Sequence, residues 1–154
     1  MKTEKNTDRW LLEYDSEGEI YTSSDTDESR IKNVLHLFNG STTFYCCLSD
    51  NTDESCLWCV GEPDRRMIEG RLFENKRLFH FVIRRKSDAA EEAFIIRCGM
   101  EPNETIRLTS AEILSRSEAI RIFTTFYEGK TIPDDFFLQE KVCLFGSLSF
   151  KDEA

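Results

Sequence analysis

Apolar residues recur at helical spacing in an early part of the chain. They stand at i, i+3, i+4 and i+7, which places them on one face of a helix. These residues are Ile31, Val34, Leu35 and Phe38. Asp27 and the polar residues before it offer an N-cap, and Asn39-Gly40 closes the pattern. The pattern therefore predicts a helix over residues 27–38.

A second helix is predicted in the last third of the chain. Thr109-x-x-Glu112 and Ser115-x-x-Glu118 both have the pattern of a capping box, and Ser115 is the better candidate because a broad apolar face follows it. That face consists of Ala119, Ile120, Phe123, Phe126 and Tyr127. Gly129 is the expected residue just beyond the helix, and Pro133 follows at the distance typical of a helix end.

Between the two helices the apolar positions alternate as they do in β-strands. Short runs rich in β-branched and aromatic residues are separated by turn residues, which indicates an antiparallel meander. The expected strands cover residues 42–48, 55–60, 66–73, 77–85 and 92–98, with a last strand over 136–145. The predicted fold is α+β, with an antiparallel meander of about five strands and two main helices packed on one face.

The length of 154 residues suits a single domain. We expect residues 1–24 to form an N-terminal arm or a short hairpin around Ser16-Glu17-Gly18, and residues 25–150 to form one α+β domain. No apolar run approaches the length of a membrane span, and the first residues do not have the pattern of a signal peptide. These features predict a cytoplasmic protein that does not bind membranes.

The net charge of the chain indicates which class of partner it can bind. Twenty basic residues against 29 acidic ones give a net charge of −9. Residues 1–64 contain 14 acidic and 5 basic side chains, so this segment accounts for the whole excess. Nucleic acid favours basic surfaces, whereas an acidic face speeds encounter with a cationic partner. We therefore expect a basic protein partner and no binding to nucleic acid.

The residues with catalytic or metal-binding potential do not form a known constellation. Cys56-x-x-Cys59 lacks a well-placed second pair, because the adjacent Cys46 and Cys47 point to opposite faces of a strand. No phosphate loop, dinucleotide-binding motif or nucleophile elbow occurs. We expect buried, reduced cysteines, no cofactor and no enzymatic activity, with a metal or redox protein built on the cysteines as an alternative.

The segment from Ser117 to Pro133, SEAIRIFTTFYEGKTIP, resembles the C-terminal motif of bacterial polymorphic-toxin immunity proteins. It is most similar to the family called immunity protein one, and the preceding order of an early helix and a meander is similar too. The resemblance implies a non-enzymatic protein that binds a cognate toxin C-terminal domain, often a nuclease or deaminase, inside the producing cell. The alternative is an adaptor or regulatory module that binds some other protein.

Partner-binding residues are predicted from charge and loop position. One acidic ridge is expected beside a strand end, a second acidic site at the corner between the last helix and the last strand, and an aromatic anchor on the outer sheet face. The predicted residues are Asp50, Asp53, Glu54, Glu62 and Asp64 for the ridge, Asp134 and Asp135 for the corner, and Trp58 for the anchor, with Tyr45 as the other candidate. A position for Trp58 in the core is the alternative.

Overall fold

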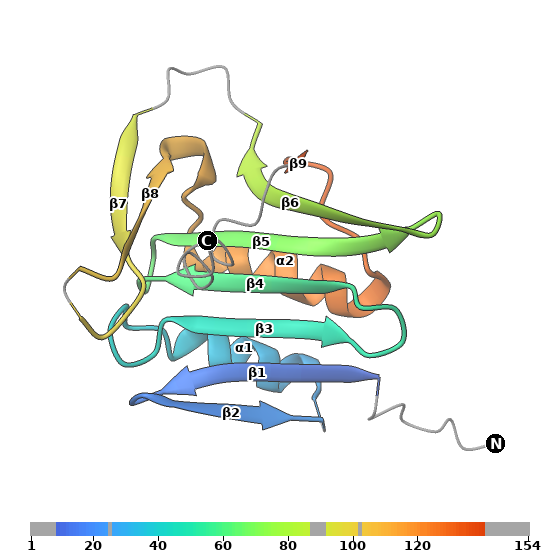
Figure 1. Ribbon diagram of the computed structural model, residues 1–154, viewed down its shortest axis with the longest axis horizontal. Helices are drawn as coiled ribbons and strands as arrows, with labels where there is room; N and C mark the ends of the chain where they lie inside the picture. Colours follow the sequence, from blue (N-terminus) through green and yellow to red (C-terminus); the bar gives the residue numbers. More distant parts are fainter. Residues whose placement is uncertain (1–8, 25, 87–91, 102, 141–154) are drawn as a thin grey trace, which may run out of the picture.

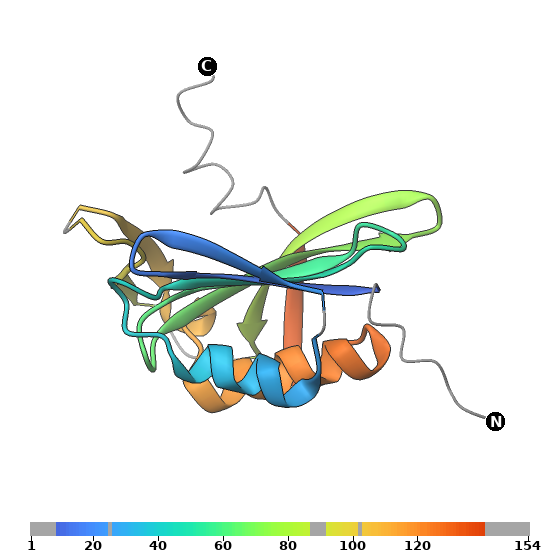
Figure 2. The same cartoon turned by 90° about the horizontal axis from the view of Figure 1, so that it is seen from below.

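The computed structural model describes residues 9–24, 26–86, 92–101 and 103–140. Seven strands form one antiparallel sheet in the order β2-β1-β3-β4-β5-β6-β9. They are β1 (Trp10–Ser16), β2 (Glu19–Ser23), β3 (Tyr45–Asp50), β4 (Cys56–Gly61), β5 (Arg66–Glu74), β6 (Arg77–Arg85) and β9 (Phe136–Glu140). Helices α1 (Glu28–His36) and α2 (Arg116–Gly129) lie together on one face of this sheet, as Figure 2 shows. The α+β prediction is confirmed, with seven strands in the main sheet where about five were expected.

Three strands of the main sheet flank the central strands β3 to β6, two at one side and one at the other. Residues 10–23 form the β1–β2 hairpin, and β1 pairs with β3, so the hairpin belongs to the same sheet as the rest. Its two-residue turn consists of Glu17 and Gly18, both with positive φ (52° and 85°), as a type I′ turn requires. At the other side β9 pairs with β6. Residues 141–145 of the predicted last strand lie outside the described residues.

Both predicted helices form, and their caps explain where they begin. The Asp27 side chain accepts a hydrogen bond from the Arg30 backbone N–H (2.8 Å) and starts α1. At α2, Ser115 Oγ accepts from the Glu118 N–H (3.2 Å) while Glu118 Oε1 accepts from the Ser115 N–H (2.9 Å). This is the reciprocal capping box that the sequence predicts.

The C-terminal end of α2 differs from the prediction by one residue. Gly129 is still helical, and Lys130 takes the left-handed conformation with φ 53° and ψ 37°. A residue other than Gly, Asn or Asp is uncommon in this conformation, because its Cβ crowds the backbone. Contacts with distant residues hold Lys130 in place, as described below.

The main core lies between the sheet and the two helices. Its sheet side comes from alternating residues of the strands, and its helix side from the apolar faces predicted above. Fully buried members include Leu12, Leu48, Ile68, Phe81, Ile31, Leu35, Phe123 and Phe126. Trp10 packs edge-on against Phe126, with ring centroids 5.6 Å apart.

A second, smaller core lies on the opposite face of the sheet. Strands β7 (Ala93–Arg97) and β8 (Thr105–Thr109) form a separate two-stranded sheet that packs there. This core contains Tyr45, Val60, Met67, Ile96, Cys98, Ile106 and Leu108. β7 was expected as a member of the meander, but β6 already pairs with β5 and β9, so neither side of β6 is open to it. A short 3₁₀ helix, η1 (Ser110–Glu112), then leads toward α2.

Candidate functional site

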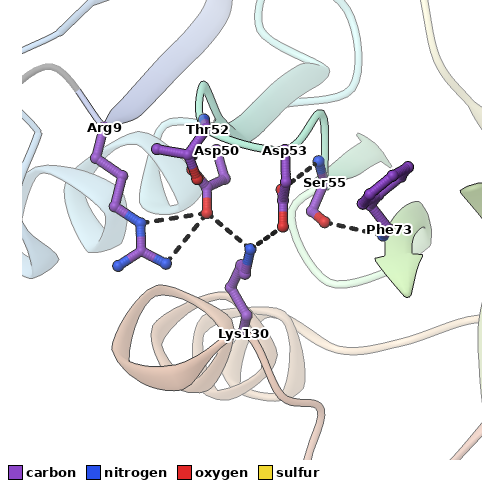
Figure 3. A network of polar contacts seen from close by, with 7 residues as sticks. All are labelled: Arg9, Asp50, Thr52, Asp53, Ser55, Phe73 and Lys130. Carbon is purple, nitrogen blue, oxygen red and sulfur yellow. Dashed lines mark hydrogen bonds and ion pairs between the residues drawn. The ribbon is translucent and has the colours of Figure 1, made fainter. Parts of the chain in front are cut away.

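The turn between β3 and β4 contains the first predicted acidic residues, and it is tied to the end of α2 (Figure 3). Asp50 ends β3 and is only 1% exposed. Its Oδ2 accepts hydrogen bonds from Arg9 Nε and Nη2 (3.2 and 3.1 Å) and lies 2.9 Å from Lys130 Nζ. Thr52 donates to Oδ1 through its backbone N–H (2.9 Å) and its hydroxyl (2.6 Å). The carboxylate of Asp50 is therefore bound by other residues of the protein and is not available at the surface to bind a partner.

These contacts set the charge state of the carboxylate. Burial alone would raise the pKa of Asp50, but the hydrogen bonds from Thr52, Lys130 and Arg9 outweigh it and hold that pKa well below its usual range. Asp53 accepts from the Ser55 N–H (2.9 Å) and pairs with Lys130, and its pKa is lowered in the same way against the effect of burial. Both groups are thus ionised at neutral pH, and they hold the cation of Lys130 between them.

The predicted acidic ridge is not one surface. Glu54 is exposed at the β3–β4 turn, whereas Glu62 and Asp64 follow the far end of β4. A strand of this length separates its ends by roughly 17 Å. The single ridge expected from the sequence is therefore wrong, because the hairpin places its members at opposite ends of β4.

Glu62 and Asp64 have structural contacts at their end of the sheet. Glu62 Oε2 accepts from the backbone N–H of Arg97 in β7 (2.8 Å), which links the small sheet to the large one. Asp64 is exposed, and its Oδ1 accepts from the Arg116 N–H (2.9 Å) at the first turn of α2. The turn itself is held by the buried Arg66, which donates to the carbonyl oxygen of Glu62 (3.1 Å).

The second predicted acidic site forms an exposed corner between α2 and β9. Asp135 pairs with Arg121 of α2, and this hydrogen bond lowers the pKa of Asp135. Asp134 is also exposed, and its carbonyl oxygen accepts from Lys86 Nζ. Two cations therefore accompany the two carboxylates, so the corner is close to neutral.

Trp58 lies on the sheet face opposite the helices. It is half-buried, its register partners are Cys47 and Glu69, and it packs at the border of the second core. The guanidinium of Arg71 lies over its ring, 4.8 Å from the centroid. Trp58 is therefore neither a fully exposed anchor nor a fully buried core residue, because part of its ring is packed and part remains accessible.

The cysteines meet in pairs across β3 and β4. Cys46 faces Cys59 on the helix side, where both are fully buried, and Cys47 shares a hydrogen bond with Cys56 on the other face. That hydrogen bond, helped by the cation of Arg71, lowers the pKa of Cys56. These cysteines and Cys98 are free thiols, while Cys143 lies outside the described residues. In the described part of the chain, no group of three or more His, Cys, Asp or Glu side chains is arranged to hold a metal ion.

The structure brings together an acidic surface that sequence reasoning missed. The turn between β1 and β2 lies against the loop between β7 and β8, where the Met100 sulfur is 3.4 Å from the position a Cβ on Gly18 would occupy. The two segments that meet here contain four exposed glutamates, and we call them the acidic end. They are Glu17, Glu19, Glu101 and Glu104. Nearby, Arg97 donates to the Met100 carbonyl oxygen (2.7 Å).

One signal in the sequence could have indicated half of this surface. Residues 10–29 contain seven acidic side chains and no basic one. The other half could not be found, because the contact between residues 18 and 100 depends on β8, which was not predicted. Exposed apolar side chains accompany the acidic end, namely Ile20, Met100 and, farther along β7, Ile95.

Comparison with known proteins identified no relative from which the function could be transferred. No protein-family model matches the chain, and no curated protein or solved structure matches it significantly. Among the described residues, no helix is both long and apolar enough to cross a membrane. The structure thus defines an α+β protein with two helices on one face of an antiparallel sheet, and its function has to be inferred from its own surface.

Proposed function

We propose that the protein is an immunity protein, which binds the C-terminal domain of a cognate bacterial toxin and neutralises it by covering its active site. The observation that carries the proposal is the acidic end, where two segments distant in sequence present four exposed carboxylates beside exposed apolar side chains. The resemblance of residues 117–133 to immunity protein one supports the same function. The protein acts by binding and catalyses no reaction.

The proposed mechanism follows from charge. Toxins that cut or modify nucleic acid need a basic surface to hold their substrate. Carboxylates at the acidic end pair with that surface and exclude the substrate, while apolar side chains such as Met100 supply desolvated contacts. A stable complex of this kind buries about 1,600 Å² in total. The exposed corner at Asp134 and Asp135 is a weaker candidate, because Arg121 and Lys86 offset its charge.

The first experiment is affinity purification of the tagged protein from its own cells, followed by growth assays. We expect one basic protein domain at equal stoichiometry, and we expect co-expression of the chain to restore growth of cells that produce this domain. The double variant Glu17→Lys, Glu19→Lys should lose protection, whereas Glu74→Lys, Glu128→Lys should keep it. The control pair is exposed, changes the net charge equally and lies away from the acidic end. Recovery of a non-toxic partner would favour the adaptor hypothesis, and loss of protection in both variants would exclude a specific role of the acidic end.

A further inference from the structure

Strand β2 is the outermost strand at one side of the main sheet. Among the described residues it pairs with β1 alone and occupies the first position in the strand order, so its other side faces away from the sheet (Figure 1). Glu19, Ile20, Tyr21 and Thr22 are all exposed, with Ile20 at 59% and Tyr21 at 44%. Natural proteins usually protect an open edge of this kind with charged side chains, especially lysine, with proline or with a bulge, because the edge can pair with another strand. β2 contains no proline and no basic residue, and its one charged residue is Glu19 beside the turn.

The register shows which backbone groups face outward. Ser16 and Glu19 flank the two-residue turn, so they form a closely hydrogen-bonded pair, and such pairs alternate along the hairpin. Tyr21 and its partner Tyr14 are the next pair of this type. The residues between them, Ile20 and Thr22, therefore direct their N–H and C=O groups toward the open edge. Their side chains lie on the sheet face opposite the helices.

Charge decides what can pair with this edge. Residues 10–29, which include the hairpin, contain seven acidic side chains and, apart from tyrosine, no other ionisable side chain. A second copy of β2 would bring its own carboxylates to the same edge, and an acidic strand would be repelled in the same way. A strand with lysine or arginine side chains would instead face Glu19 and, across the turn, Glu17.

We propose that a basic β-strand of the partner adds to β2 and extends the seven-stranded sheet. This inference rests on the proposed function and specifies how the partner is held. Backbone hydrogen bonds to Ile20 and Thr22 supply affinity, and the carboxylates of the hairpin select a cationic strand. The exposed Ile20 and the ring of Tyr21, stacked on Tyr14 at 5.5 Å, offer apolar contacts on the two faces.

The test uses a synthetic probe and the intact chain. The probe is a capped peptide of about seven residues, long enough for an average strand, in which lysine and valine alternate. A matched peptide has glutamate in place of lysine. Amide signals are followed by ¹⁵N NMR at low salt while each peptide is added. We expect the lysine peptide to shift the Ile20 and Thr22 amides and to slow their hydrogen exchange at least tenfold, and we expect no effect from the glutamate peptide.

A variant separates strand addition from simple charge attraction. Thr22→Pro removes an outward N–H at an edge position, where proline is tolerated, while Thr22→Ala keeps it. We expect Thr22→Pro to weaken binding of the lysine peptide at least tenfold and Thr22→Ala to change it less than twofold. If Thr22→Pro does not fold, the exchange rates of the wild-type amides decide alone. Binding with unchanged exchange at Ile20 and Thr22, binding elsewhere, or no binding of the lysine peptide would overturn the proposal.

The outcome is independent of the growth assay. A chain that protects cells but shows no effect at β2 would remain an immunity protein with another interface. A chain that binds the lysine peptide through β2 but protects no cell would lose the proposed function, and with it the identity of the partner.

Discussion

Lys130 Nζ lies 2.9 Å from Asp50 Oδ2, which joins the end of α2 to the turn between β3 and β4. The two residues are far apart in sequence, and Lys130 makes this contact while its backbone is in the unfavourable left-handed conformation. Asp53 holds the same ammonium group, so two carboxylates converge on one lysine. The contact fixes the position of α2 on the sheet, and it explains why the helix ends one residue later than its glycine indicates.

Substitution of Lys130 tests this explanation. Lys130→Ala removes the ion pairs and keeps the strained backbone, so we expect a loss of about 2 kcal/mol in the free energy of unfolding, less than for a wholly unpaired buried charge because Arg9 remains. Lys130→Gly loses the same pairs but relieves the strain, which should return about 1 kcal/mol. Urea denaturation measures both. Glu128→Ala, at an exposed site in the same turn, should change stability by less than about 0.5 kcal/mol. Equal losses for the alanine and glycine variants would show that the backbone of Lys130 is not strained.

Acid should weaken the same connection. The pKa of Asp50 is lowered on folding, so its contribution to stability is complete above the unfolded value of about 3.9 and is lost as the pH falls below it. Asp53 and Glu118 act in the same direction, because their pKa values are also lowered. We expect the free energy of unfolding to fall steeply between about pH 5 and pH 2. Asp15, whose pKa is raised by burial, opposes this trend.

A single substitution shows how much of the acid sensitivity comes from Asp50. Asp50→Asn should be less stable than the wild type at pH 7 and should approach it as the pH falls, because the wild-type carboxylate is then protonated. Urea denaturation at several pH values gives both curves. Parallel curves for the two proteins would show that the pKa of Asp50 does not change on folding.

The sequence predicted those parts of the fold that depend on local patterns. The apolar faces of α1 and α2 and the cap at Ser115 follow from helical spacing and hydrogen bonding within a few residues. The left-handed conformation of Lys130 could not be predicted, because residues distant in sequence select it. β8 was missed because its alternation covers only Ile106 and Leu108.

The same distinction applies to the candidate site. Acidic residues are visible in a sequence, but their availability depends on tertiary partners. Asp50 and Glu54 are near neighbours in one turn, and the first is buried while the second is exposed. The acidic end depends on the contact between Gly18 and Met100, which joins two loops that no local pattern relates. Charge counting therefore predicts a class of partner, a basic protein, and it misplaced part of the acidic surface.

Trp58 and Arg71 should be coupled in stability. The guanidinium lies over the indole ring on an incompletely covered face of the sheet. A cation–π contact at an exposed site of this kind contributes about 0.5–1 kcal/mol to stability. Trp58→Ala should cost about 2–3 kcal/mol, below the range for a fully buried tryptophan, because the ring is half-buried. The double variant Trp58→Ala, Arg71→Ala should lose less stability than the sum of the two single losses, and the difference is the coupling energy. Urea denaturation of all four proteins gives this double-mutant cycle. Strict additivity would show that the stacked geometry does not contribute to stability.

Association with a basic partner should depend on salt through the acidic end. Exposed charges act over roughly 10 Å at 0.1 M salt and only about 3 Å at 1 M, so they mainly accelerate encounter. For the basic domain that affinity purification is expected to recover, the association rate should fall at least tenfold between 0.05 and 0.5 M salt, with a smaller change in the dissociation rate. Glu17→Lys, Glu19→Lys should reduce the low-salt association rate about tenfold and flatten its salt dependence. Stopped-flow fluorescence gives both rates, and Glu74→Lys, Glu128→Lys serves as the control of equal net charge. If the two double variants associate equally slowly, the net charge of the chain steers the encounter and the acidic end has no special part in it.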